Sequence, residues 1–143
     1  MSALDRAALR QGASVALVFA VPFSIGARLV ADNSSDNPWA VLLSLAALAG
    51  FTLGAGVAAW VQRNRLPLLH GMVCAGGTYL AAQAVFVAIK LFRGGDVNWL
   101  GVFFTFTAVL FAGLVGGMLG SVMRKRGLVP ASERASESKG EQP

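Results

Sequence analysis

The sequence predicts an all-helical integral membrane protein in which four transmembrane helices form a single bundle. Of its 143 residues, 55% are hydrophobic and only 13% are charged, whereas about 25% of the residues of an average soluble domain are charged. The mean hydropathy is +0.63. A short chain has a large surface for its volume, and this one lacks the polar residues to cover that surface. The composition therefore excludes a soluble globular domain.

Four apolar runs have the length of roughly 20 residues that a helix needs to cross a bilayer. They are residues 12–30, 39–61, 68–89 and 99–123, within a transmembrane domain of residues 12–126. Only the first run contains a charged residue, Arg28, and it also contains Pro22, which neighbouring helices in a membrane can accommodate. A cleaved signal peptide is the alternative for this run. Its candidate cleavage sites place the branched residues Ile25 or Leu29 at position −3, which disfavours cleavage.

The basic residues divide unequally between the two sides of the predicted bundle. Three lie at one end (Arg28, Lys90 and Arg93), and nine lie at the other end: Arg6, Arg10, Arg63, Arg65, Arg124, Lys125, Arg126, Arg134 and Lys139. Cytoplasmic loops carry the excess of Lys and Arg. We therefore expect both termini to be cytoplasmic, residues 1–11 as a short N-terminal segment and residues 127–143 as a disordered tail with little to bury. Arg28 is expected to extend toward the outer headgroups and to pair with Asp32.

The second and fourth runs share an order of landmarks. Each opens with a tryptophan (Trp39 and Trp99), continues with closely spaced glycines and closes with arginines (Arg63 and Arg124). The chain therefore resembles one helical hairpin used twice in parallel orientation. Two antiparallel hairpins also converge on such features for topological reasons alone, so duplication and convergence both remain open.

Small residues recur every four positions in each run, which places them on one helix face. Because lipid tails are as apolar as Leu, membrane helices associate where small side chains allow close backbone approach. The four stripes are Gly12, Ala16, Ala20 and Ser24; Ala46, Gly50, Gly54 and Ala58; Gly77, Ala81, Ala84 and Ala88; and Gly113, Gly117 and Ser121, with Gly116 and Gly120 beside them. We expect these faces to point inward. The two stripes of the fourth run predict contact with two neighbours or with a second subunit.

The residues that membrane enzymes and proton-coupled transporters need are missing from the four runs. No Asp or Glu occurs in any of them, so no titratable carboxylate lies at mid-bilayer depth. One cysteine and one histidine, Cys74 and His70, cannot form a zinc site. We therefore expect no enzymatic activity, no metal and no cofactor. The net charge of +5 resides at the ends of the runs, which points to membrane orientation and not to nucleic acid.

Three polar residues are candidate interhelical contacts: Gln83, Thr78 and His70. Gln83 lies near the middle of the third run, where a hydrogen bond to another helix contributes roughly 0.6 kcal/mol. An alternative is that Gln83, Thr52 and Thr107 line a polar pathway. His70 opens the third run, where it either caps the helix or senses cytoplasmic pH.

A glycine pattern from residue 50 onward resembles the YrzE-like family of small four-helix bacterial membrane proteins. It consists of Gly50-x-x-x-Gly54-x-Gly56, then Leu69-His70-Gly71, then Gly116-Gly117-Met118-Leu119-Gly120 before a basic end. The resemblance covers residues 50–126. It implies the same architecture and a bacterial inner membrane, and it supplies no substrate, cofactor or catalytic residue.

Two functions remain compatible with the sequence. The first is a structural or accessory role, in which glycine faces pack against a second copy or a larger membrane complex. The second is a small oligomeric channel or facilitator, which would need several copies because four tightly packed helices leave no lumen. In either case we expect the interior to be dry, so a cavity that reaches Gln83 would contradict this expectation.

Overall fold

The computed structural model describes residues 4–33, 37–131 and 133–135, and all regular secondary structure within them is helical. The four long helices are α1 (Arg6–Asn33), α2 (Pro38–Val61), α3 (Pro67–Phe92) and α4 (Trp99–Lys125). Each is long and apolar enough to cross a membrane. The prediction of an all-helical chain with four such helices is confirmed for the described residues.

Local sequence signals explain where the helices begin and end. The side chains of Asn37 and Asn98 accept hydrogen bonds from the first-turn amides of α2 and α4, at 3.1 and 3.0 Å, as N-cap residues do. α1 continues through Pro22 without an interruption. Gly94 and Gly127, just beyond the ends of α3 and α4, have φ angles of +72° and +78°, a conformation that glycine adopts without steric cost.

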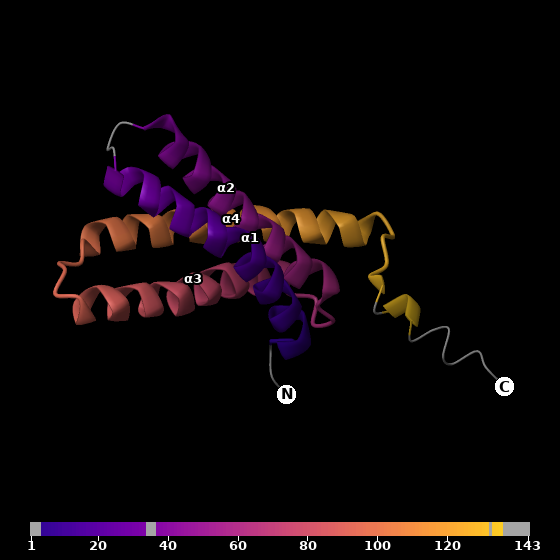
Figure 1. Cartoon of the computed structure of the whole chain (residues 1–143). Helices are drawn as coiled ribbons and strands as arrows, with labels where there is room; N and C mark the ends of the chain where they lie inside the picture. The colour runs from indigo at the N-terminus through magenta and orange to yellow at the C-terminus, as the bar shows by residue number, and fades with distance from the viewer. Residues whose placement is uncertain (1–3, 34–36, 132, 136–143) are drawn as a thin grey trace.

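The helices form two antiparallel hairpins, α1–α2 and α3–α4, which cross each other obliquely (Figure 1). α1 packs on α2, α4 contacts both α2 and α3, and α1 also touches α3. Both termini lie toward the end of the bundle at which α1 begins and α4 ends, called here the terminal end. At the opposite end, called the hairpin-turn end, α1 finishes at Asn33 and α4 starts at Trp99.

Glycines of α2 and α4 lie at the closest helix contacts. A Cβ atom added at Gly54 would lie 2.6 Å from both the Ala16 Cβ and the Gly12 carbonyl oxygen of α1. One added at Gly50 would lie 2.8 Å from the Ala20 nitrogen. Since real Cβ atoms do not approach so closely, only glycine permits this separation between α1 and α2.

The fourth helix uses its two adjacent glycine stripes against two neighbours within the chain. Gly113 and Gly117 face the start of α3, where a Cβ at Gly117 would lie 3.1 Å from the Leu68 Cα. Gly116 and Gly120 face α2, and a Cβ at Gly120 would lie 2.5 Å from the Gly56 carbonyl oxygen. Both stripes are therefore covered inside a single copy.

The face predicted for the third helix is wrong. Gly77 has no atom within 4 Å of an added Cβ, and Ala81, Ala84 and Ala88 are exposed. α3 instead turns inward the face that carries its buried polar and small residues: His70, Gly71, Cys74, Ala75, Thr78, Tyr79 and Gln83. Both faces of α3 contain small side chains, but only one of them also carries polar groups. Because polar groups are costly against lipid, the face that carries them turns inward.

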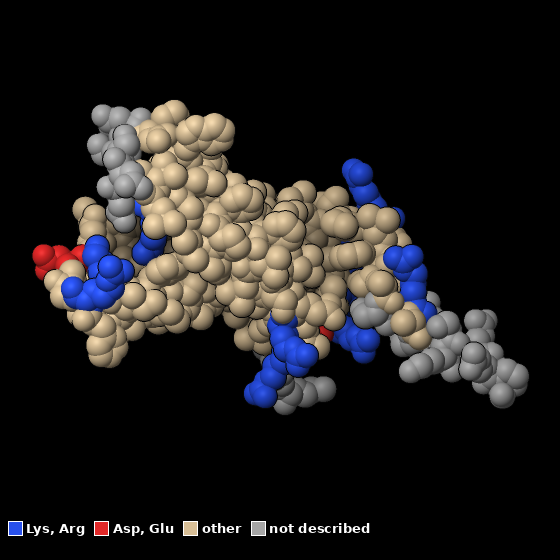
Figure 2. All heavy atoms as spheres, viewed as in Figure 1, with Lys and Arg blue, Asp and Glu red and all other residues tan. Residues whose placement is uncertain are grey.

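The outer surface is apolar between two charged ends. Figure 2 shows Lys and Arg gathered at both ends of the molecule and below the start of α1, with uncharged atoms across the middle. Large apolar side chains such as Phe92, Leu100 and Phe104 are highly exposed. Such a surface suits lipid contact.

The first part of the tail has a defined course against the bundle. Trp60 Nε1 donates a hydrogen bond to the Leu128 carbonyl oxygen at 2.7 Å, and Arg124 pairs with Glu133 at 3.4 Å. Pro130 is buried. Trp60 and Arg124 thus supply partners for this stretch, and the disorder expected from residue 127 onward stays a prediction. Residues 136–143 lie outside the described part of the chain.

Candidate functional site

A cavity of about 580 Å³ opens at the hairpin-turn end between α1, α3 and α4. Three cationic residues line it: Arg28 of α1, Lys90 of α3 and Arg93, which follows α3. Polar side chains of Tyr79, Gln83, Asn98 and Thr105 also line it. Among the described residues, none of those lining the cavity is acidic. The site is therefore cationic, and all three basic residues of this end contribute to it.

Arg28 turns toward the third helix. Its Nη2 donates a hydrogen bond of 2.9 Å to Gln83 Oε1, and its Cζ lies 4.4 Å from the centroid of the Phe86 ring, within the range of a cation–π contact. The expectation that the Arg28 side chain extends toward the outer headgroups is wrong, because α3 offers it an amide oxygen and an aromatic face. The side chain of Asp32, its expected partner, lies outside the described residues.

Lys90 and Arg93 bring two further charges to the mouth of the cavity. Within the described chain, no hydrogen bond or ion pair engages either side chain. The turn after α3 lies against the Lys90 stem: a Cβ at Gly95 would be 3.1 Å from the Lys90 Cγ. Both charges are thus available to a ligand.

A second cavity of about 250 Å³ lies deeper, among all four helices. Its lining is mainly apolar and includes Val21, Leu48 and Val109. Five residues line both cavities, so the two adjoin one another: Arg28, Tyr79, Gln83, Phe86 and Thr105. The expectation of a closed interior around Gln83 is therefore wrong, because α1–α2 and α3–α4 do not meet closely in this half.

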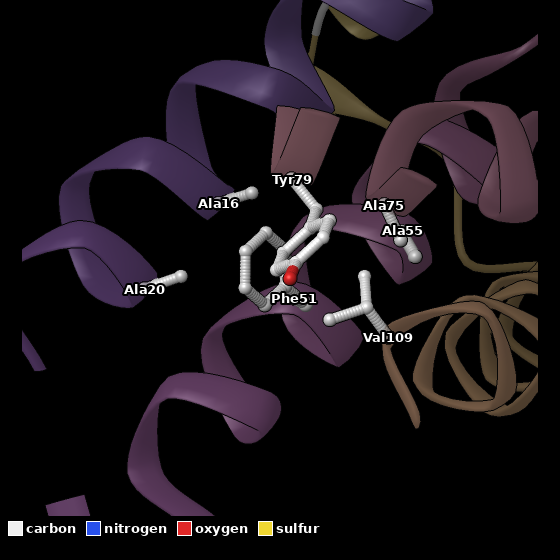
Figure 3. Packing of buried hydrophobic residues seen from close by; sticks show 7 residues of the cluster. All are labelled: Ala16, Ala20, Phe51, Ala55, Ala75, Tyr79 and Val109. Carbon is white, nitrogen blue, oxygen red and sulfur yellow. The ribbon is translucent and has the colours of Figure 1, made fainter. Parts of the chain in front are cut away.

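An aromatic cluster closes the deeper cavity toward the terminal end. The Phe51 and Tyr79 rings meet edge to face with centroids 6.2 Å apart, and the Tyr79 hydroxyl donates to the Val102 carbonyl oxygen at 3.0 Å. Figure 3 shows these rings between Ala16 and Ala20 on one side and Ala55, Ala75 and Val109 on the other. The cluster fixes Tyr79 at the boundary between packed core and cavity.

The three predicted polar contacts occupy different places. Gln83 joins Arg28 in the cavity, and Thr78 is buried on the inner face of α3. His70 is fully buried near the terminal end, where its Nε2 accepts a hydrogen bond from the Asp5 amide at 2.8 Å and its Nδ1 lies 2.8 Å from the Leu66 carbonyl oxygen. His70 thus ties the start of α1 to the start of α3.

Sequence reasoning did not assign the cavity residues Lys90, Arg93, Tyr79 and Asn98 to a common site. A signal was present, since Arg28 and Lys90 stand near the matching ends of the first and third helices. What the sequence does not contain is the direction of each side chain. Gln83 is 55 positions from Arg28, and their contact follows only from the packing of α1 on α3.

The described residues contain no group of three or more His, Cys, Asp or Glu side chains placed to hold a metal ion. No protein-family model, curated protein or solved structure matches the chain.

Proposed function

We propose that the chain is a multi-pass protein of the bacterial cytoplasmic membrane, related to the YrzE-like proteins, with both termini in the cytoplasm. The division of nine basic residues at the terminal end against three at the hairpin-turn end supports this orientation. The cavity then faces the outer leaflet. The contribution of Arg28 and Lys90 to one site also fits two copies of one hairpin placed side by side.

Within that membrane, the proposed function is to bind an anionic ligand in the cavity between the hairpins, as a small facilitator or carrier protein would. The main supporting observation is that the Arg28 guanidinium, on a helix proposed to span the membrane, contacts a neutral amide and an aromatic ring and no carboxylate among the described side chains. A charge inside a spanning segment is costly unless it is compensated. An anion in the cavity would supply that compensation, with Lys90 and Arg93 adding to the attraction.

A structural role through helix packing is the second candidate. The glycines of α2 and α4 are used within one copy, so a partner would have to pack elsewhere. The exposed stripe of Gly77, Ala81, Ala84 and Ala88 on α3 is a surface of the required kind. In this role, Gly77→Leu would reduce the mass of a detergent-solubilised oligomer, and Arg28→Gln would leave it unchanged.

The ligand-binding proposal is tested by thermal unfolding of the purified protein in a neutral detergent at low salt. The probes are inorganic phosphate, glycerol phosphate and phosphatidylglycerol, each compared with an uncharged or zwitterionic counterpart. A ligand that binds only the folded state raises the unfolding temperature. We expect at least one anionic probe to raise the unfolding temperature more than its uncharged or zwitterionic counterpart does. Arg28→Gln should remove this difference.

Lys125→Gln is the matched control, because it removes one exposed positive charge at the terminal end. It should leave the anion effect unchanged. Equal stabilisation by the anionic and neutral probes, or an equal loss in both variants, would refute the proposal.

A further inference from the structure

Resting on the proposed anion site, we infer that its ligand is a membrane lipid with an anionic phosphate headgroup. The phosphate lies in the cationic cavity, and one acyl chain enters the deeper cavity. The inference comes from the junction of the two cavities, which share Arg28, Gln83 and Phe86 among their lining residues. A ligand with a charged end and an apolar end would place its charge in the cationic cavity and its apolar part in the deeper, mainly apolar cavity.

The depth of the cations fits the headgroup layer. α1 has 28 residues, which at 1.5 Å per residue is about 42 Å, close to the thickness of a bilayer including its headgroups. Arg28 lies five residues before the end of α1 at Asn33, or about 7–8 Å along the axis. Its backbone therefore lies near the boundary between headgroups and hydrocarbon, and its guanidinium turns inward to Gln83. Lys90 and Arg93 lie at the end of α3, at the depth of the headgroups.

The deeper cavity has the size and character for an acyl chain. Its volume of about 250 Å³ exceeds that of a roughly 150 Å³ apolar cavity that stays dry and binds benzene. Ala27, Leu48, Phe51 and Val109 contribute apolar surface to it. Each methylene buried there should tighten binding about fourfold.

Charge complementarity favours an anionic lipid over a zwitterionic one. Three cations and no described acidic residue line the headgroup cavity. The exposed Asp96 stands in the turn between the lining residues Gly95 and Val97, so the charge of the lining itself favours a phosphate. A free phosphate would fill the mouth and leave the apolar cavity unused. The two cavities together therefore favour the lipid over the free ion.

The test compares lipids that differ in one feature at a time, with the full-length protein in neutral detergent. The probes are dihexanoyl and dioctanoyl phosphatidylglycerol, phosphatidylcholine with the same chains, and glycerol phosphate. We expect dioctanoyl phosphatidylglycerol to bind about 15-fold more tightly than the dihexanoyl form, because one buried chain gains two methylenes, and to bind more tightly than either phosphatidylcholine. Arg28→Gln should remove the headgroup preference and keep the chain-length dependence.

Two neighbouring residues of α3 provide a matched pair for the chain. Ala82 lines only the deeper cavity, whereas Ala81 is exposed on the outside. Ala82→Leu should bring the affinity of dioctanoyl phosphatidylglycerol down to that of the dihexanoyl form, and Ala81→Leu should leave it unchanged. Equal chain-length dependence in both variants would overturn the inference.

Photo-crosslinking of the unmodified protein gives a second measurement that does not depend on the folding of a variant. Phosphatidylglycerol with a diazirine at the chain end should label Leu48 or Val109 in preference to the exposed Leu80. Labelling of Leu80 alone would refute a buried chain. If glycerol phosphate stabilised the protein as much as the long-chain lipid does, the lipid inference would be refuted and the anion site would stand. If no anionic probe stabilised the protein, both the lipid inference and the proposed anion site would be refuted.

Discussion

Replacing Gly120 by alanine tests the idea that glycine sets the distance between α2 and α4. The added Cβ would lie 2.5 Å from the Gly56 carbonyl oxygen, 2.8 Å from the Ala59 Cβ and 2.9 Å from the Trp60 nitrogen. Two of these three atoms belong to the backbone of α2, so the helices must separate. Overpacking of this kind costs about 1–3 kcal/mol, and the gain in helix propensity returns about 0.5–1 kcal/mol. We expect a net loss of about 1–2 kcal/mol, a factor of 5–30 in the folded-to-unfolded ratio.

Cys74 provides the assay, because it is the only cysteine of the chain and it is 3% exposed. The purified protein is titrated from neutral detergent into dodecyl sulfate, and unfolding is followed by the labelling of this thiol with a maleimide dye. Gly120→Ala should shift the midpoint to a lower dodecyl sulfate fraction than wild type.

Gly77→Ala is the matched control, since a Cβ there meets no atom within 4 Å. It should be neutral or slightly stabilising through helix propensity alone. The reasoning fails if Gly120→Ala is as stable as wild type, or if the two alanine variants lose the same stability.

Three further substitutions test single hydrogen bonds. His70→Phe removes the acceptor of the Asp5 amide, so exchange of that amide with deuterium should accelerate about fivefold, as expected for a bond of about 1 kcal/mol. An unchanged exchange rate would contradict a hydrogen bond from the Asp5 amide to His70. Trp60→Phe removes the donor to the Leu128 carbonyl, so trypsin should cleave the C-terminal segment faster than in wild type. Tyr79→Phe should lower the free energy of unfolding by about 0.5–1.5 kcal/mol, measured by the same thiol assay.

The helical architecture was predictable because a chain with runs long and apolar enough to cross a membrane has few structural choices. Without water in the hydrocarbon core, backbone groups must be satisfied within each spanning segment, so four long apolar runs translate into four helices. The run 39–61 corresponds to α2 at Pro38–Val61, and 99–123 to α4 at Trp99–Lys125. The length and the apolar composition of each run decide these elements, and no information about neighbouring helices is needed.

The inner face of α3 and the direction of Arg28 depend on neighbouring helices and were not predictable in this way. α3 carries small residues on two faces, and the face with His70 and Gln83 turns inward because other helices satisfy these polar groups. The Arg28 side chain could extend in two directions, outward to the headgroups or inward to Gln83. Choosing between them requires the position of α3 relative to α1, which the sequence pattern of α1 does not contain.

The location of the cavity follows from where the small residues fall along each helix. Gly12 and Ala16 lie in the first half of α1, Gly54 in the second half of α2, and Gly117 in the second half of α4. All of these positions belong to the terminal half of the bundle, where backbones approach closely. The hairpin-turn half lacks such glycine contacts between the two hairpins, and the side chains of Arg28 and Phe86 line the space between them. The same glycines that close one half of the bundle therefore leave the other half open, next to the three cations that give the cavity its charge.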